Sequence, residues 1–561
     1  MLDSFKKNVI AIVLISVFII GTISILMFQN GGLAQGAPPF KDNERDNRGF
    51  DEHEDRHRTP THPRNKRDID VDDEDYNIDQ PTKEPLLPKE GPFNRINGVY
   101  EKNKKVNIKR ANQVKEAMKF AWDRYSTNVF GYDELRPLSN KPNEWFGLAI
   151  TIMDSLDTLK IMGLNDEFEQ GKQYVKNTLN FEKKDDKVNV FESVIRVLGG
   201  LLSTYQLTGD KLFLNKAEEF GKLLLHAFHD KDPLPYGYLN LKTKEGQYLS
   251  WTGGCAILSE AGTMFLEFET LSQLTNNPIY KEKVDKILSS FIKYDSRSPG
   301  LIPIMLKPDG TKSCSSEISL GAMGDSYYEY LIKTWIYSNK TDNRYRDLYV
   351  KAANSIIENL YSEVNGAGLV TNYYEGTSKT SSRGGQQEHL TCFAGGMFAL
   401  GAAAQVSKDA TQNEKYMEVG KKITETCYKS YEMSPTGLGP EKFRVDEKGR
   451  VAFGGSPEYK LRPETVESLF VLYRLTGDAL YQEWAWNIFQ SIEKHCRVEN
   501  GYVGLHDVSN PNNKEDLQQS FFMAETLKYL YLTFTDASVI PLDQFVFNTE
   551  AHPMRIVQTK H

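Results

Sequence analysis

Five short segments of the sequence place acidic side chains beside bulky apolar residues, although most acidic residues lie on a solvated surface. The segments are residues 190–193, 324–330, 462–467, 521–526 and 547–552. Burial beside aromatic rings raises the pKa of a carboxyl group, which suits a general acid, and an apposed ionised carboxylate can activate water. Such a pair performs glycoside hydrolysis, with inversion where the carboxyls lie about 6.5–9.5 Å apart. The sequence predicts the pair without giving its separation.

Among these acids, Glu464 and Glu467 give the clearest sequence signal, because Pro463 directly before them favours the first turn of a helix. Residues three apart on a helix face the same way, here near the positive end of the helix dipole. The apolar run that follows favours a buried polar pocket over a surface helix start. Asp154 and Asp157 share this spacing, and for them a functional site and simple helix capping stay equally open.

The sequence lacks the features that are typical of sites for transition metals, nucleotides and nucleic acids. It has no cysteine and histidine cluster with transition-metal spacing, no His-Glu-x-x-His pattern and no glycine-rich phosphate loop, so zinc and nucleotide chemistry are not expected. A formal net charge of -8 gives no basic surplus for binding a nucleic acid. A neutral substrate fits this charge better than a nucleic acid does. Calcium, which accepts hydroxyl, carbonyl and carboxylate oxygens, remains possible, and Thr549 alone is a weak ligand candidate.

Helices must position these acids, because apolar residues recur three and four apart over stretches such as 109–125 and 193–205. Three helical patterns end in related Leu-Thr sequences, whose leucines are Leu207, Leu274 and Leu475. Their spacings are 67 and 201, three times 67, which indicates stacked helical hairpins of about 65 residues each. Roughly seven such hairpins fit the chain. Runs of alternating polarity are few, so the expected fold is all-α, a toroid of paired helices.

The N-terminal region reads as a membrane anchor and a stem. Residues 9–28 carry no charge, and roughly 20 apolar residues cross a bilayer. Two lysines precede them, which leaves residues 1–8 in the cytosol. A cleaved signal peptide stays open because residues 34–37 are mostly small. Residues 29–97, rich in charge and proline over much of their length, are expected to form a flexible lumenal stem, and residues 98–561 the catalytic domain.

From about residue 107 to residue 553 the chain resembles the class I α-1,2-mannosidases, glycoside hydrolase family 47. The resemblance is carried by SLDTL (155–159), FESVIRVLGGLL (191–202), GDSYYEYL (324–331), LRPETVES (461–468), AETLKYL (524–530) and FNTEAHP (547–553). It implies an (α/α)7 barrel, which agrees with the hairpin count. It also implies an inverting, calcium-dependent hydrolase that removes terminal α-1,2-linked mannose from high-mannose N-glycans.

The resemblance assigns roles to single residues. Glu192 corresponds to the general acid and Glu464 to the general base, while Asp325 is a third essential carboxylate that competes for the acid role. Thr549 corresponds to a threonine that binds calcium through its hydroxyl and carbonyl oxygens. Calcium-bound waters or the sugar would be held by Glu260, Glu467, Glu525 and Glu550. Substrate-contact positions are Arg196, His389, Arg462 and Phe521, and for the two arginines an ion pair that orients the acids is the alternative.

The cysteines divide into two groups. Cys392 and Cys427 correspond to the disulfide of the family, and this bond supports an oxidising lumen. Cys255, Cys314 and Cys496 are expected to be free or buried thiols.

Met323 bears on the subfamily, because it stands two residues before Asp325. Relatives that remove one mannose in the endoplasmic reticulum carry arginine at this position, and Golgi-type relatives carry an apolar residue. The expectation is therefore a Golgi membrane enzyme that trims eight- or nine-mannose glycans toward five, with a single-mannose enzyme of the endoplasmic reticulum membrane as the alternative. Asn339 begins the one N-glycosylation sequon of the sequence.

The rival from another functional class is a mannosidase-like lectin of glycoprotein quality control that acts in recognition or disposal of misfolded chains. Those relatives lack the paired cysteines and often carry further domains, whereas this chain has Cys392 and Cys427. A glycosidase built on the smaller six-hairpin barrel is a further alternative, but such a protein would not be expected to carry the FNTEAH sequence of residues 547–552 near its end.

Overall fold

The computed structural model describes residues 96–183, 186–294, 298–375 and 385–558. The chain divides into two units, Met1–Pro81 and Thr82–His561, and every described residue belongs to the second unit. The predicted cytosolic tail, the predicted anchor at residues 9–28 and nearly all of the predicted stem therefore lie outside the described residues. Among the residues that are described, no helix is both long enough and apolar enough to cross a membrane.

Helices dominate the described part of the chain, as the hydrophobic periodicity predicts. Seven of the described helices are buried along most of their length: α4 (Ile150–Ile161), α7 (Gly199–Thr208), α10 (Phe265–Thr275), α12 (Asp325–Tyr337), α14 (Ala394–Ala403), α16 (Glu464–Thr476) and α18 (Leu527–Thr533). Each of these inner helices packs against the next one. The series closes where α4 packs against the π-helical segment Phe522–Thr526, which leads into α18.

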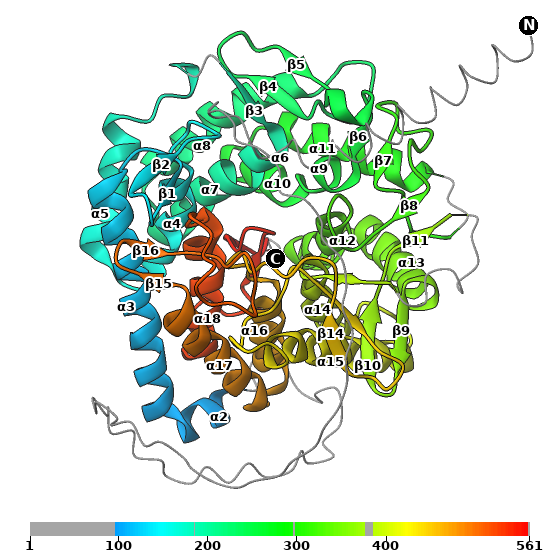
Figure 1. Ribbon diagram of the computed structural model, residues 1–561. Helices are drawn as coiled ribbons and strands as arrows, with labels where there is room; N and C mark the ends of the chain where they lie inside the picture. Colours follow the sequence, from blue (N-terminus) through cyan, green and yellow to red (C-terminus); the bar gives the residue numbers. More distant parts are fainter. Residues whose placement is uncertain (1–95, 184–185, 295–297, 376–384, 559–561) are drawn as a thin grey trace, which may run out of the picture. The chain divides into compact units, whose positions relative to one another are not determined.

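Amphipathic helices pack outside this inner series. They are α3 (Lys104–Asn128), α5 (Asn165–Asn177), α8 (Lys211–Leu224), α11 (Ile279–Lys293), α13 (Asn343–Asn359), α15 (Ala410–Glu432) and α17 (Leu480–His495). Each of them packs against the inner helix that it follows in the sequence, except that α3 packs against α18 and is preceded by the short α2 (Ile96–Lys102). Figure 1 shows these pairs one after another around the centre of the view.

The repeated Leu-Thr sequences mark the turns of three hairpins, as predicted. The inner helices end there at Gly209, Asn276 and Gly477, which adopt left-handed φ angles of 71°, 54° and 74°. Helices commonly end at a residue in the left-handed conformation, which glycine and asparagine adopt with little strain. Asp210 and Asp478 then accept hydrogen bonds of 2.9 Å from backbone N–H groups two residues later, at the start of the outer helix.

Strands are short and antiparallel, and they form sheets of two or three strands between the helices. The described sheets pair β1 (Glu134–Arg136) with β2 (Lys141–Asn143), β3 (Lys187–Asn189) with β4 (Tyr238–Asn240) and β5 (Gly246–Gln247), β6 (Ala256–Ile257) with β7 (Met305–Leu306), β8 (Glu317–Ile318) with β11 (Tyr373–Tyr374), β9 (Tyr361–Val364) with β10 (Ala367–Val370), β12 (Gln387–Glu388) with β13 (Lys442–Val445) and β14 (Val451–Phe453), β15 (Arg497–Val498) with β16 (Gly501–Tyr502), and β17 (Phe545–Phe547) with β18 (Pro553–Arg555).

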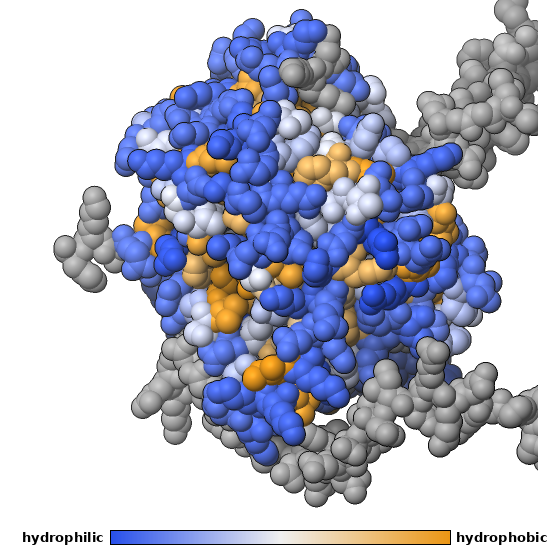
Figure 2. All heavy atoms as spheres, turned by 90° about the vertical axis from the view of Figure 1, so that its left-hand side faces the viewer, coloured by the Kyte–Doolittle hydropathy of each residue, from blue (hydrophilic) through white to orange (hydrophobic). Residues whose placement is uncertain are grey.

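The outer helices turn their polar sides to solvent. Figure 2 shows one face of the molecule, which is mainly hydrophilic and carries small, separate apolar patches. Such scattered apolar side chains are normal for a folded surface. The fold therefore concentrates its apolar residues between the two helical layers, and the loops at the ends of the inner helices are left to build a site.

Candidate active site

One cavity of about 270 Å³ collects most of the residues that the sequence singled out. Its lining includes ten of them: Glu192, Arg196, Asp325, Arg462, Glu464, Glu467, Phe521, Glu525, Thr549 and Glu550. They come from the starts of α12 and α16, from the segments that lead into α7, α16 and α18, and from the turn between β17 and β18. Segments far apart in the sequence thus supply one acidic pocket, where helix dipoles favour negative charge.

Asp325 is the first residue of α12 and faces other acids. Burial raises the pKa of its carboxyl group to about 7, and the nearby negative charges of Glu329 and Glu464 add to the effect. The backbone N–H of Ser326 donates to Asp325 Oδ1 at 2.9 Å and opposes this rise without cancelling it. Asp325 can therefore carry a proton near neutral pH, which a general acid requires.

Glu464 opens α16 and has the opposite character. Burial disfavours its charge, but a hydrogen bond from His389 and the positive charge of Arg462 outweigh burial and lower the pKa of Glu464 below its ordinary value. His389 Nδ1 lies 2.8 Å from Glu464 Oε2, and His389 Nε2 lies 2.7 Å from the hydroxyl of Tyr431. Glu464 is thus held as a carboxylate, the form that a general base needs.

The two predicted arginines line the cavity and form ion pairs, and only Arg196 pairs with predicted acids. Arg196 Nε donates to Glu192 Oε2 at 2.6 Å, and Arg196 also pairs with Glu550. Arg462 Nε donates to Glu441 Oε1 at 2.7 Å. The ring of Phe521 lies 5.9 Å from the guanidinium carbon of Arg196 and 5.9 Å from that of Arg462.

Thr549 lies in a tightly bonded turn between β17 and β18. Its hydroxyl donates to Glu329 Oε2 at 2.8 Å. Asn548 Oδ1 accepts hydrogen bonds from the backbone N–H groups of Glu550 and His552 at 2.9 and 2.8 Å. These bonds fix the turn, because they satisfy backbone donors that a buried loop would otherwise leave unpaired.

The cavity is lined by an excess of acidic side chains, which fits a bound cation. Seven carboxylate side chains line it against two arginines. Burial and mutual repulsion raise the pKa of Glu467 to about 7 and those of Glu525 and Glu550 well above their ordinary values. No group of three histidine, cysteine or acidic residues in the described part of the chain could hold a metal directly. The oxygens of Thr549, with water filling the remaining positions, are a donor set that calcium accepts.

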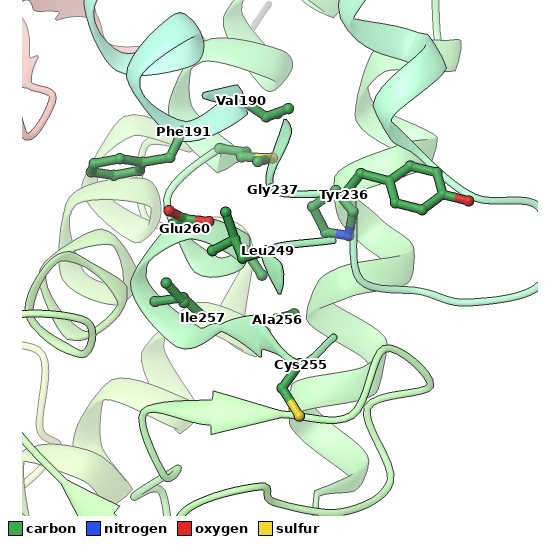
Figure 3. A pocket seen from close by; sticks show the side chains of 12 residues that line it. Val190, Phe191, Tyr236, Gly237, Leu249, Cys255, Ala256, Ile257 and Glu260 are labelled. Atoms are coloured by element: carbon green, nitrogen blue, oxygen red, sulfur yellow. The ribbon is translucent and has the colours of Figure 1, made fainter. Parts of the chain in front are cut away.

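Two predicted residues lie beside the cavity rather than in its lining. His389 lies behind Glu464, as described above. Glu260 lines a second, smaller cavity of about 10 Å³, which shares Phe191 with the main one; Figure 3 shows its carboxyl group near Phe191 and Leu249. Asn189 Nδ2 donates to Glu260 at 3.0 Å, and Asn189 Oδ1 accepts from the backbone N–H of Glu192 at 2.9 Å. Glu260 therefore reaches the main site through Asn189, and burial raises its pKa to about 7.

Asp154 and Asp157 are not helix caps, since both are fully buried in the interior of α4. Asp154 Oδ2 pairs with Arg196 at 3.2 Å, which ties it to the wall of the cavity. Asp157 pairs with Lys528 at 2.9 Å and with His552 at 2.8 Å. Both acids support the site from beneath its lining.

The sequence interpretation gave no role to Glu329, Lys333, Glu441 or His552, each of which contacts a predicted residue or the Thr549 turn. A signal was present for the first two. Asp325, Glu329 and Lys333 are spaced four apart and so share one helix face. Glu441 and His552 follow only from the tertiary fold.

The disulfides confirm one prediction and correct another. Cys392 and Cys427 are bonded, as predicted, and Cys496 is a buried thiol. The prediction that Cys255 and Cys314 are thiols was wrong, because they form a disulfide across 59 residues. The pairing of β6 with β7 brings them together: Cys255 directly precedes β6, and the backbone N–H of Cys314 donates to Met305 in β7 at 2.8 Å.

Comparisons with known proteins cover the segment that supplies all these residues. Residues 117–556 match the family described as glycosyl hydrolase family 47. The chain is 45% identical over 456 residues to a mannosyl-oligosaccharide α-1,2-mannosidase IA of Drosophila melanogaster, spanning 80% of this chain and 67% of that protein. It is 44% identical over 466 residues to a mannosyl-oligosaccharide 1,2-α-mannosidase of Arabidopsis thaliana, spanning 81% and 80%. A solved α-1,2-mannosidase from Trichoderma reesei has a TM-score of 0.73 and 30% identity, covering 80% of this chain and 99% of that one.

Proposed function

Because the chain belongs to glycosyl hydrolase family 47, we propose that it is a glycosidase that removes terminal α-1,2-linked mannose from high-mannose N-glycans. The observation that carries this proposal is one cavity in which the pKa of Asp325 is raised and that of Glu464 is lowered. Two carboxyl groups whose pKa values are pushed apart by their surroundings are suited to act as acid and base. The mannosidases to which the chain is similar support the choice of sugar.

The proposed reaction is hydrolysis with inversion. The carboxylate of Glu464 takes a proton from a water molecule as that water attacks the anomeric carbon. Asp325 gives its proton to the oxygen of the departing sugar as the glycosidic bond breaks. The family resemblance gives this acid role to Glu192. However, burial and the nearby acids raise the pKa of Asp325 to about 7, which favours Asp325 as the donor.

Calcium is the proposed cofactor, and the residues around Thr549 fit it. Thr549 would contribute its hydroxyl and carbonyl oxygens, while Glu467, Glu525 and Glu550 would hold waters bound to the ion. When bound, the ion would supply positive charge that orients sugar hydroxyl groups. The proximity of these acids is the support for this assignment, since their charges repel one another in a buried site.

The finer architecture follows the same proposal. The closed series of inner helices, each paired with an outer helix, supports an (α/α)7 barrel with the acidic cavity at one end of its inner helices.

We propose that residues 9–28 anchor this domain in the Golgi membrane with the domain in the lumen. The apolar Met323 in the cavity lining favours trimming of eight- or nine-mannose glycans toward five.

The test is digestion of Man9GlcNAc2 by the purified full-length chain, with calcium and after chelation, followed by chromatography of the products. Calcium-dependent passage to five mannoses is expected. Arrest at one eight-mannose isomer would contradict the Golgi-type assignment, and the endoplasmic reticulum membrane would then be the expected location. A folded chain that binds the glycan but releases no mannose would contradict the enzymatic function and favour a lectin of quality control.

A further inference from the structure

Lys333 is a buried cation on α12 that the proposed reaction does not use. Lys333 is only 2% exposed to solvent. Its ammonium group donates to the carboxylate of Glu329, to Glu467 Oε1 at 3.1 Å and to the carbonyl of Asn548 at 3.4 Å. Lys333 therefore joins α12, α16 and the turn that carries Thr549.

Glu329 transmits this contact to Thr549. Its Oε1 atom pairs with Lys333, and its Oε2 atom accepts the hydroxyl proton of Thr549 at 2.8 Å. A hydroxyl has one proton and two lone pairs. Because the proton is directed to Glu329, the lone pairs of the Thr549 hydroxyl stay available for another ligand. Lys333 thus sets the orientation of the group that would bind a metal.

Apart from these partners, the surroundings of Lys333 provide few groups that can balance its positive charge. A cavity of about 20 Å³ adjoins it, and most of its lining is apolar: Ile336, Leu400, Val471, Tyr529, Leu542, Phe545, Val546 and Phe547. A buried charge is costly unless it is paired. The compensating charges are the carboxylates of Glu329 and Glu467, both of which line the main cavity.

We propose that Lys333 is a positioning residue that supplies part of the positive charge of the site before calcium binds. It holds Glu329 and Glu467 in place at a point where seven carboxylates would otherwise repel one another. Calcium then balances the remaining charge of the same carboxylates, so it can compensate in part for the loss of Lys333. This inference rests on the proposed calcium site and deepens it.

Lys528 provides a matched control on the other side of the same turn. It is fully buried, pairs with Asp157 at 2.9 Å and donates to the carbonyl of Ala551 at 2.7 Å. Lys528 therefore supports the turn by the same chemistry as Lys333, but it pairs with Asp157 and not with Glu329 or Glu467, and it does not line the main cavity. The charge of Lys528 lowers the pKa of Glu550, but among the described residues no ion pair joins Lys528 to a residue of the cavity lining, so its loss should weaken the fold and leave a smaller charge deficit at the calcium site than the loss of Lys333.

The experiment measures the Tm of the purified full-length chain in detergent, after chelation and again with added calcium. K333M keeps the length of the side chain and removes its charge, K528M does the same at the control position, and K333R retains the charge. Without calcium, K333M and K528M should each melt about 3–5 °C lower, because each breaks a buried ion pair. Calcium should recover most of the loss in K333M and much less of the loss in K528M. K333R should show the calcium increment of the unaltered chain.

Equal calcium increments in K333M and K528M would overturn the proposal, since Lys333 would then be an ordinary structural ion pair. A K333M chain that does not fold even with calcium would also overturn it, because the metal could not replace the missing charge. An unaltered chain with no calcium increment would remove the calcium site itself. Release of mannose by that same chain distinguishes this failure from a failure of the proposed enzymatic function.

Discussion

The starts of α12 and α16 are built alike and behave in opposite ways. Each helix opens with a carboxylate that faces the same cavity, Asp325 in one and Glu464 in the other. Burial disfavours the charge of both groups, and both lie at the positive end of a helix dipole. Nevertheless, the pKa of Asp325 is raised to about 7 and that of Glu464 is lowered.

The neighbours of the two carboxyl groups account for the difference. Two residues before Glu464 stands Arg462, whose positive charge helps to lower its pKa, and His389 hydrogen-bonds its side chain. Two residues before Asp325 stands Met323, and the nearby charge of Glu329 is negative. The helix start thus delivers a carboxyl group to the cavity, whereas the side chains around it decide which protonation state it adopts.

Removal of the base is expected to have the largest effect. E464Q keeps the size of the side chain but cannot accept a proton, so kcat should fall by roughly 10³-fold or more. Measurement of turnover on Man9GlcNAc2, together with calcium and inhibitor binding, separates loss of chemistry from loss of the site. Binding should be retained. Near-normal turnover in E464Q would exclude Glu464 from the mechanism.

Removal of the acid tests the other helix start. Asp325 acts in its protonated form, so activity should be lost as the pH rises through about 7. D325N cannot ionise. It should lower kcat by roughly 10²–10³-fold, and the remaining activity should no longer fall on the alkaline side.

The matched variant is E192Q, because Glu192 competes with Asp325 for the acid role. The pH dependence of kcat in both variants decides between them. E192Q should lose activity and still show the alkaline fall. If instead D325N kept that fall and E192Q lost it, Glu192 would be the proton donor.

Much of this site could be predicted from the sequence because it is assembled from the starts of amphipathic patterns. Glu464 follows Pro463 and precedes a long apolar run, so both its helix and its buried position are visible in the residues. The repeated Leu-Thr sequences likewise predicted the hairpin turns at Gly209 and Gly477. In each case the signal lies within a few neighbouring residues.

The features that sequence reasoning missed depend on contacts between distant segments. Cys255 and Cys314 lie 59 residues apart, and only the pairing of β6 with β7 brings them together. Glu441 meets Arg462 through the tertiary fold. The spacing of Asp154 and Asp157 left a functional site and a helix cap equally open, and their burial against Arg196, Lys528 and His552 excludes the cap. Local periodicity carries no record of such partners.

A smaller effect is expected where the base keeps its carboxylate and loses its partner. Glu464 acts when ionised, so activity falls as the pH drops through its pKa. H389Q removes the ring that bonds Glu464 Oε2, which should raise that pKa and move the acidic limb to higher pH. We expect about a tenfold loss of kcat.

The control for H389Q is Y431F, which removes the hydroxyl bonded to His389 Nε2 and leaves the contact with Glu464. Its acidic limb should stay close to that of the unaltered chain. A raised KM in H389Q with an unmoved acidic limb would favour the predicted role of His389 as a substrate contact.

The smallest effect should come from making the two helix starts alike. M323R places a positive charge two residues before Asp325, as Arg462 stands before Glu464, and a nearby cation favours the ionised carboxyl. The pKa of Asp325 should fall by roughly one unit, so the alkaline limb moves to lower pH and kcat at pH 7 falls about fivefold. M323L adds no charge and should leave the limb in place. If the limb of M323R did not move, the charge at this position would not set the protonation of Asp325, and burial with the charges of Glu329 and Glu464 would account for it.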